Sequence, residues 1–92
     1  MGGARPEPDN AIYLDTYGFI LFQKKQYQVA VVELEKAVAL LSTDQEIWEH
    51  LGDAYFMLGD EVKALECWNK ALLLNPAHTK LKEKINQKKF IE

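Results

Sequence analysis

Three carboxylates of this 92-residue chain stand at a spacing that could serve chemistry. Glu46, Glu49 and Asp53 fall at i, i+3 and i+7, so a helix would place all three on one face. An enzyme that used two of them as acid and base would need surroundings that separate their pKa values. A solvated helix face, or a surface that contacts a partner, needs no such surroundings. The pattern leaves open a catalytic pair, a partner contact and a solvated face.

Histidine and cysteine offer less to catalysis. His50 and His78 have no second ligand at a metal spacing, and Cys67 is the single cysteine of the chain. A lone cysteine beside Trp68 is typical of a small apolar residue in a core. The sequence has no glycine-rich phosphate loop, no Ser/His/Asp arrangement and no HExxH pattern. We therefore expect no enzyme activity, no cofactor and no bound metal.

Charge and composition argue against two further classes of protein. The formal net charge is −3, and residues 1–76 hold 12 acidic and 6 basic side chains. An acidic body argues against general nucleic-acid binding, which depends on Lys and Arg at phosphates. A basic tail of five lysines and two glutamates follows in residues 77–92. No apolar run approaches the roughly 20 residues that span a bilayer, so no transmembrane segment is expected.

The candidate residues lie on a repeated pair of predicted helices. When the chain is shifted by 34 residues, small residues fall on small ones and large apolar residues on large ones. The identical pairs are Gly18 with Gly52, Phe22 with Phe56, Ala30 with Ala64, Lys36 with Lys70, Ala37 with Ala71 and Leu40 with Leu74. Apolar residues recur at helical spacing and the linkers are short, so successive helices must be antiparallel.

Four segments follow from this pattern. We expect a flexible lead-in over residues 1–10, a first helix pair over 11–44, a second over 45–78 and a capping helix over 79–92. In the capping helix, Ala77, Leu81 and Ile85 form a narrow apolar stripe. The lysines, Lys84 included, are expected to cover the remaining polar face.

Particular residues indicate where the helices of the second pair begin and end. Thr43 followed by Glu46 fits a capping box, with Asp44 as the alternative cap. Gly59 is expected to end the first of these helices, because glycine accepts a left-handed conformation. Asp60 is then expected to cap the next helix.

The second unit resembles the tetratricopeptide repeat, whose period is 34 residues. Its matching positions are Trp48, Leu51, Gly52, Tyr55, Ala64, Trp68 in place of phenylalanine, Ala71 and Pro76. The first unit is a weaker copy, with Leu14, Tyr17, Gly18, Leu21, Ala30, Leu34 and Ala37, and with Ser42 where the family has proline. Residues 13–18 and 49–55 are also similar to the final repeats of long bacterial tetratricopeptide proteins. Many of those proteins work at the cell envelope, and the sequence leaves the compartment open between the cytoplasm and the cell envelope, the latter through a longer parent chain.

The resemblance implies an all-α fold, a fragment of a right-handed α-solenoid, that acts as a protein–protein interaction module. The first helix of each pair would line a concave groove that holds a peptide or a partner helix. Carried over position by position, the groove residues are Ile12, Asp15, Phe19, Phe22, Gln23, Glu46, Glu49, Asp53, Phe56 and Met57. The alternative is a structural role alone, as terminal repeats that stack or self-associate.

The predicted groove is acidic and aromatic. Chaperone-binding members of the family carry Lys and Asn at the positions held here by Asp15, Phe19, Glu49 and Asp53. An acidic chaperone tail is therefore not expected, and a basic and apolar segment is the predicted ligand. The repeated phenylalanines serve either as scaffold or as binding anchors. The first unit is also expected to leave apolar surface open, Val29 and Val32 included, and to self-associate through it.

Overall fold

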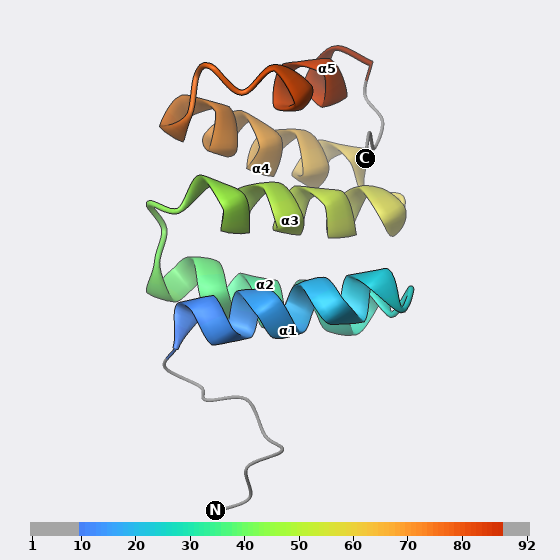
Figure 1. Cartoon of the computed structure of the whole chain (residues 1–92). Helices are drawn as coiled ribbons and strands as arrows, with labels where there is room; N and C mark the ends of the chain where they lie inside the picture. Colours follow the sequence, from blue (N-terminus) through green and yellow to red (C-terminus); the bar gives the residue numbers. More distant parts are fainter. Residues whose placement is uncertain (1–9, 88–92) are drawn as a thin grey trace, which may run out of the picture.

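The computed structural model describes residues 10–87, and in that range the chain forms five α-helices and no strand. They are α1 (Ala11–Gln23), α2 (Tyr27–Leu40), α3 (Gln45–Met57), α4 (Glu61–Leu74) and α5 (Thr79–Gln87). Figure 1 shows the pair α1/α2 at one end of a stack, the pair α3/α4 next to it and α5 at the far end. The predicted all-α architecture is confirmed. Most of the predicted lead-in and residues 88–92 of the predicted capping helix lie outside the described residues.

Asparagine and aspartate side chains cap the starts of α1, α3 and α4; at α4, Asp60 accepts from the Lys63 backbone N–H at 3.1 Å, as predicted. Asn10 accepts a hydrogen bond from the Tyr13 backbone N–H at 3.0 Å, at the start of α1. Asp44 accepts from the N–H groups of Glu46 and Ile47, at 2.9 and 3.3 Å, at the start of α3. The predicted Thr43 capping box is therefore wrong and its alternative is correct. Thr43 lies one residue too early, because α3 begins at Gln45 directly after Asp44.

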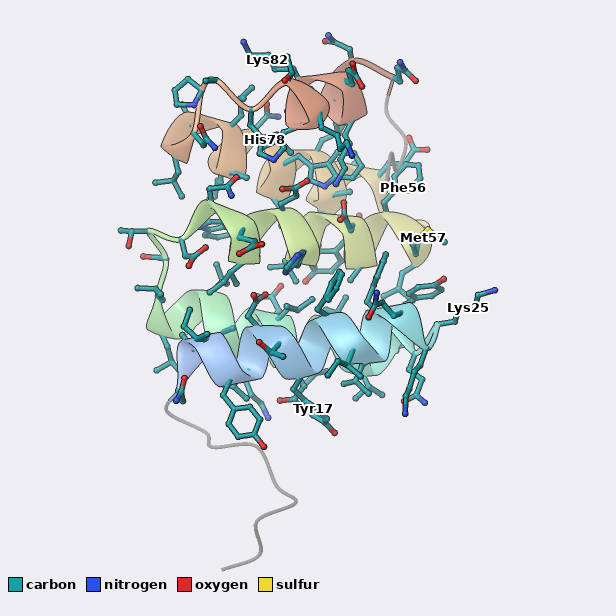
Figure 2. The ribbon with its side chains drawn as sticks, in the orientation of Figure 1. Tyr17, Lys25, Phe56, Met57, His78 and Lys82 are labelled. Atoms are coloured by element: carbon teal, nitrogen blue, oxygen red, sulfur yellow. The ribbon has the colours of Figure 1, made fainter. Side chains whose placement is uncertain are left out.

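The turns inside the two helix pairs use different residues in one backbone conformation. Gly59 has a φ of 90°, as its predicted role at the end of α3 requires. Lys25 stands 34 residues earlier, at the end of α1, and has a φ of 65°. Figure 2 shows Lys25 at the turn that joins α1 to α2. A lysine in the left-handed region carries a steric cost that glycine avoids.

Each helix pair is closed by a glycine that faces a large side chain. A Cβ added at Gly18 would lie 2.7 Å from Leu34 Cγ, and one added at Gly52 would lie 2.6 Å from Trp68 Nε1. Leu34 and Trp68 are both fully buried. The glycines therefore let the two axes of each pair approach, with a leucine at the contact in the first pair and a tryptophan in the second.

Within residues 10–87, no helix packs against the outer face of α1. On α3, Ile47 and Ala54 are fully buried, because α2 packs on that side. Their repeat equivalents on α1 are Tyr13 and Ile20, and both are exposed. Figure 2 shows Tyr17, which lies between them in sequence, on the side of α1 that faces away from α3. We call Tyr13, Tyr17 and Ile20 the end face.

None of the described helices is long and apolar enough to cross a membrane.

Candidate functional site

A concavity of about 230 Å³ lies between α1, α3 and the start of α5. It is formed by side chains from the first helix of each pair and by three basic residues that follow α4. Its lining consists of Phe19, Phe22 and Gln23 from α1, of Gln45, Glu46, Glu49, His50 and Asp53 from α3, and of His78, Lys80 and Lys84. Figure 1 shows α1 and α3 on the same side of the stack, with α2 and α4 behind them.

The structure brings six of the ten predicted groove residues to this lining: Phe19, Phe22, Gln23, Glu46, Glu49 and Asp53. Four others lie elsewhere. Ile12 and Met57 are exposed outside the concavity, and Asp15 is buried beside His50. Phe56 packs against Trp68, with ring centroids 5.6 Å apart. Figure 2 shows Phe56 and Met57 together at the C-terminal end of α3.

Three rings form an aromatic shelf on one side of the concavity. Phe19 stacks on His50 with centroids 4.6 Å apart and lies 6.4 Å from the nearly parallel ring of Phe22. Phe22 in turn contacts Tyr27 edge-on at 5.3 Å. Phe19 keeps 36% of its surface exposed. The aromatic shelf, defined by Phe19, Phe22 and His50, is therefore a surface of contacting rings that solvent reaches at Phe19.

A partly buried hydrogen bond holds the histidine of this shelf. His50 Nδ1 lies 2.8 Å from Asp15 Oδ1, so α3 is tied to α1 across 35 residues of sequence. Burial lowers the pKa of His50, but the Asp15 hydrogen bond and the carboxylates of Asp15, Glu46 and Asp53 outweigh it and leave that pKa raised. The ring is thus positioned for stacking by a carboxylate that the concavity does not expose.

Two carboxylates on α3 hold one lysine from α5. Lys84 Nζ donates to Glu49 Oε2 at 2.7 Å and to Asp53 Oδ1 and Oδ2 at 2.9 and 3.1 Å. Trp68 Nε1 also donates to Asp53 Oδ1, at 3.0 Å. Lys84 is only 2% exposed. We call Glu49 and Asp53 the carboxylate pair.

Burial raises the pKa of Asp53 to about 6, although the Lys84 ammonium and the Trp68 N–H both favour its charged form. Both oxygens of Asp53 are occupied by these donors. A carboxyl group committed in this way is positioned to hold α4 and α5 in place. It is poorly placed to exchange protons with a substrate.

His78 completes the network at the start of α5. Its Nδ1 accepts from the Leu81 backbone N–H at 3.2 Å, so Nε2 carries the proton and donates to Glu49 Oε1 at 3.1 Å. Figure 2 shows the His78 ring turned inward from the chain that leads into α5. The imidazole therefore caps α5 and fixes it to α3 at once.

Sequence reasoning placed Lys84 on the solvated face of the last helix, and this is wrong. Lys84 follows Leu81 by three residues and precedes Ile85, so it lies at the edge of the apolar stripe. That register was the available signal. The prediction failed because a buried lysine is rare unless it is paired, and its partners are 31 and 35 residues away.

A second hollow of about 180 Å³ lies between α2, α3 and α4, with Cys67 in its wall. Burial raises the pKa of the Cys67 thiol to about 12, so a thiolate is disfavoured there. Within residues 10–87, no group of three or more His, Cys, Asp or Glu side chains could hold a metal ion.

Two family profiles match the chain. One, described as tetratricopeptide repeat, matches residues 45–78, and the other, described as TPR repeat, matches residues 18–59. Superkiller protein 3 of Schizosaccharomyces pombe is 32% identical over 59 residues. Those residues are 64% of this chain but 4% of that much longer relative.

Two solved structures share the fold. A crystal structure of MamA superposes with a TM-score of 0.86 at 23% identity, over 89% of this chain and 48% of the other. The first TPR of Spaghetti (RPAP3), bound to the HSP90 peptide SRMEEVD, gives 0.85 at 22% identity, over 89% of this chain and 65% of the other. This chain spans about half to two thirds of these structures, and at such identity the likeness concerns the fold.

Proposed function

The chain belongs to the tetratricopeptide repeat family over residues 18–78, and from this premise we propose that its concavity binds a peptide or a partner helix. Repeats of this family commonly mediate protein–protein interaction. The observation that carries the proposal is the aromatic shelf. Phe19 is held by ring contacts with His50 and Phe22 yet reaches solvent, as a binding anchor must.

We propose further that the bound segment is basic and apolar. Glu46 lines the concavity beside the aromatic shelf with its side chain exposed, so a partner's lysine or arginine can reach it. Such complementarity chiefly speeds encounter and sets specificity. The HSP90 peptide seen with the Spaghetti repeat is acidic. Here the positions where chaperone-binding repeats carry Lys or Asn hold Asp15, Phe19, Glu49 and Asp53, so the side chains that would bind a ligand of that kind are missing.

The proposal is tested with the tightest peptide selected from a random 12-residue library. Phe19→Ala should weaken it by about tenfold or more, because anchors in desolvated pockets dominate binding energy. Glu46→Lys should weaken it further if the peptide is basic, and added salt should do the same. The control is Leu73→Ser on α4, since Leu73 is 81% exposed away from the concavity. Affinity that follows Leu73 and ignores Phe19 would refute the proposal.

A second candidate role is structural, and the end face favours it. Tyr13, Tyr17 and Ile20 repeat the register in which α3 is buried by α2, so they could receive a preceding repeat or a second copy of the chain. Bacterial origin, and a place in the cytoplasm or at the cell envelope, stay predictions. A chain that self-associates through α1 and binds no library peptide would favour the structural role.

A further inference from the structure

α5 is attached to the rest of the molecule by few side chains. It has nine residues, and a free helix of that length is marginal in water. Leu81 is fully buried, Lys84 is buried and Ile85 is partly so. Lys80, Lys82 and Glu83 are among the exposed remainder, and Figure 2 shows Lys82 on the outer side of the helix. The position of α5 therefore depends on a short pattern of apolar, basic and apolar residues.

The surface beneath α5 is a complete receptor for that pattern. Leu81 packs with Ala64, Trp68 and Ala71 in one core cluster, against which Ile85 also packs. One helical turn after Leu81, the ammonium group of Lys84 enters the carboxylate pair. It also lies 5.8 Å from the centroid of the Trp68 ring. Trp68 therefore contributes both to the apolar floor and to the ammonium site.

The ammonium site is built for a cation. Glu49 and Asp53 receive three hydrogen bonds from Lys84, and His78 and Trp68 occupy further positions on their oxygens. Removing the lysine would leave two largely buried carboxylates without a counter-ion, which is strongly unfavourable. Any segment that replaces α5 must therefore bring a cation to the same place.

We propose that α5 is a replaceable occupant of this receptor, and that the partner is an amphipathic helix with a lysine three residues after a buried leucine. The inference goes beyond the proposed function, because it concerns the surface beneath α5 and not the aromatic shelf of the concavity. The partner's lysine enters the carboxylate pair as Lys84 leaves it. α5 is tethered to its receptor and therefore competes at a high effective concentration. A partner's helix must bind the receptor more tightly than α5 does by enough to overcome this advantage.

The probe is a synthetic peptide of residues 78–87, acetylated and amidated, together with the same peptide carrying methionine at the position of Lys84. Affinity is measured for the full-length chain, for Lys84→Met and for Lys82→Met. Lys82 is the matched control, because it lies on the same helix, carries the same charge and is exposed. Lys84→Met should bind the lysine peptide at least about tenfold more tightly than the other two chains, because its own α5 competes less well. The peptide with methionine at this position should bind Lys84→Met no more tightly than it binds the other two chains.

Equal affinity of the lysine peptide for all three chains would overturn the inference. If circular dichroism shows that Lys84→Met is unfolded, the inference is tested instead by the amide hydrogen-exchange rates of the wild-type chain. Amides of α5 should then exchange faster than those of α3 and α4, through local opening. Exchange of α5 only with global unfolding would also overturn it.

Failure of the inference and failure of the proposed function remain distinguishable. Binding of the α5 peptide is tested with the Lys84→Met variant, whereas binding of the library peptide is tested with Phe19→Ala. A gain for the α5 peptide on Lys84→Met, with no library peptide that depends on Phe19, would reject the proposed function alone.

Discussion

The first and second helix pairs place the same kinds of residue at the same turns, but the second pair is packed more fully. Gly52 faces the rigid indole of Trp68, where Gly18 faces Leu34. α3 is covered by α2 on one side, and the second pair is covered by α5 on the other, whereas Tyr13 and Ile20 of the end face are exposed. The two repeats therefore share one backbone arrangement, but the helices packed against each repeat determine which of its side chains are buried. The second pair should be the more stable half and the more sensitive to overpacking.

The largest difference is expected between Gly52→Ala and Gly18→Ala. A Cβ at Gly52 would meet the Trp68 ring and lie 3.1 Å from the Ala64 carbonyl oxygen, neither of which can easily move. A Cβ at Gly18 would lie 2.7 Å from Leu34 Cγ and 2.9 Å from Leu34 Cδ2, in a side chain that is smaller and less rigid than the indole. Overpacking of this kind costs about 1 to 3 kcal/mol, and Gly52→Ala should lie at the upper end. Urea unfolding of both variants measures it, and a larger loss at Gly18 would invalidate the comparison.

The pairs also differ in the titratable groups that join them to their neighbours. Asp53 has a folded pKa of about 6, above its usual 3.8, so the native state holds an extra proton between those values. Stability from Asp53 is therefore greatest at low pH and falls as the pH rises through 6. The raised pKa of His50 acts in the same direction, since its contribution is present below 6.5 and is lost as the pH rises past its folded value. Both make the chain more stable at pH 5 than at pH 8.

We expect a difference of about 1 to 2 kcal/mol between those two pH values, from the size of the Asp53 shift. Melting curves across the range measure it. Asp53→Asn should remove much of the slope, while Glu61→Gln, at an exposed position at the start of α4, should leave it unchanged. A wild-type chain that becomes steadily more stable from pH 5 to pH 8 would contradict this assignment.

A smaller effect is expected at the two turns. Lys25→Gly should stabilise the chain by about 0.5 to 1 kcal/mol, because glycine adopts the positive φ of this position without the steric cost of a side chain. Lys24→Gly is the control, since Lys24 has a φ of −83° and gains nothing from glycine. Gly59→Lys should cost a similar amount. If Lys25→Gly lowered the melting temperature as Lys24→Gly does, the turns would not be equivalent.

The weakest expected effect is self-association through the first pair. The exposed end face, with Val29 and Val32 also exposed on α2, should favour a two-fold dimer at micromolar to millimolar concentration. Light scattering over that range measures it, and Tyr13→Ser with Ile20→Ser should return the chain to its monomer mass of 10.6 kDa. A wild-type mass that stays at that value throughout would mean that the end face does not bind a second copy.

Local sequence signals predicted the helices well, because their causes lie within a few residues. Asp60 and Gly59 act on the nearest backbone groups, and the glycines at positions 18 and 52 mark the close helix contacts. The residues that line the concavity were harder to predict from the sequence. Phe22 and Phe56 are repeat equivalents, yet only Phe22 lines the concavity, because Phe56 packs on a tryptophan that the first pair lacks.

The contacts of His50 and Lys84 depend on partners more than 30 residues away, Asp15 for the one and the carboxylate pair for the other. No helical period encodes such pairing. Asp15 is buried although its register placed it in the groove, and its carboxylate pairs with His50. Reasoning from helical periodicity therefore could not predict which charged side chains pair in the folded structure.

The most direct test of the central claim is to map a bound peptide on the surface by NMR. Full-length ¹⁵N-labelled chain is titrated with the tightest library peptide, and backbone amide shifts are followed to saturation. Binding in the concavity predicts that the largest changes cluster at residues 19–23 and 45–53, with intermolecular contacts to the Phe19 ring. Changes confined to α2 and α4, with residues 19–23 unmoved, would show that the concavity is not the binding surface.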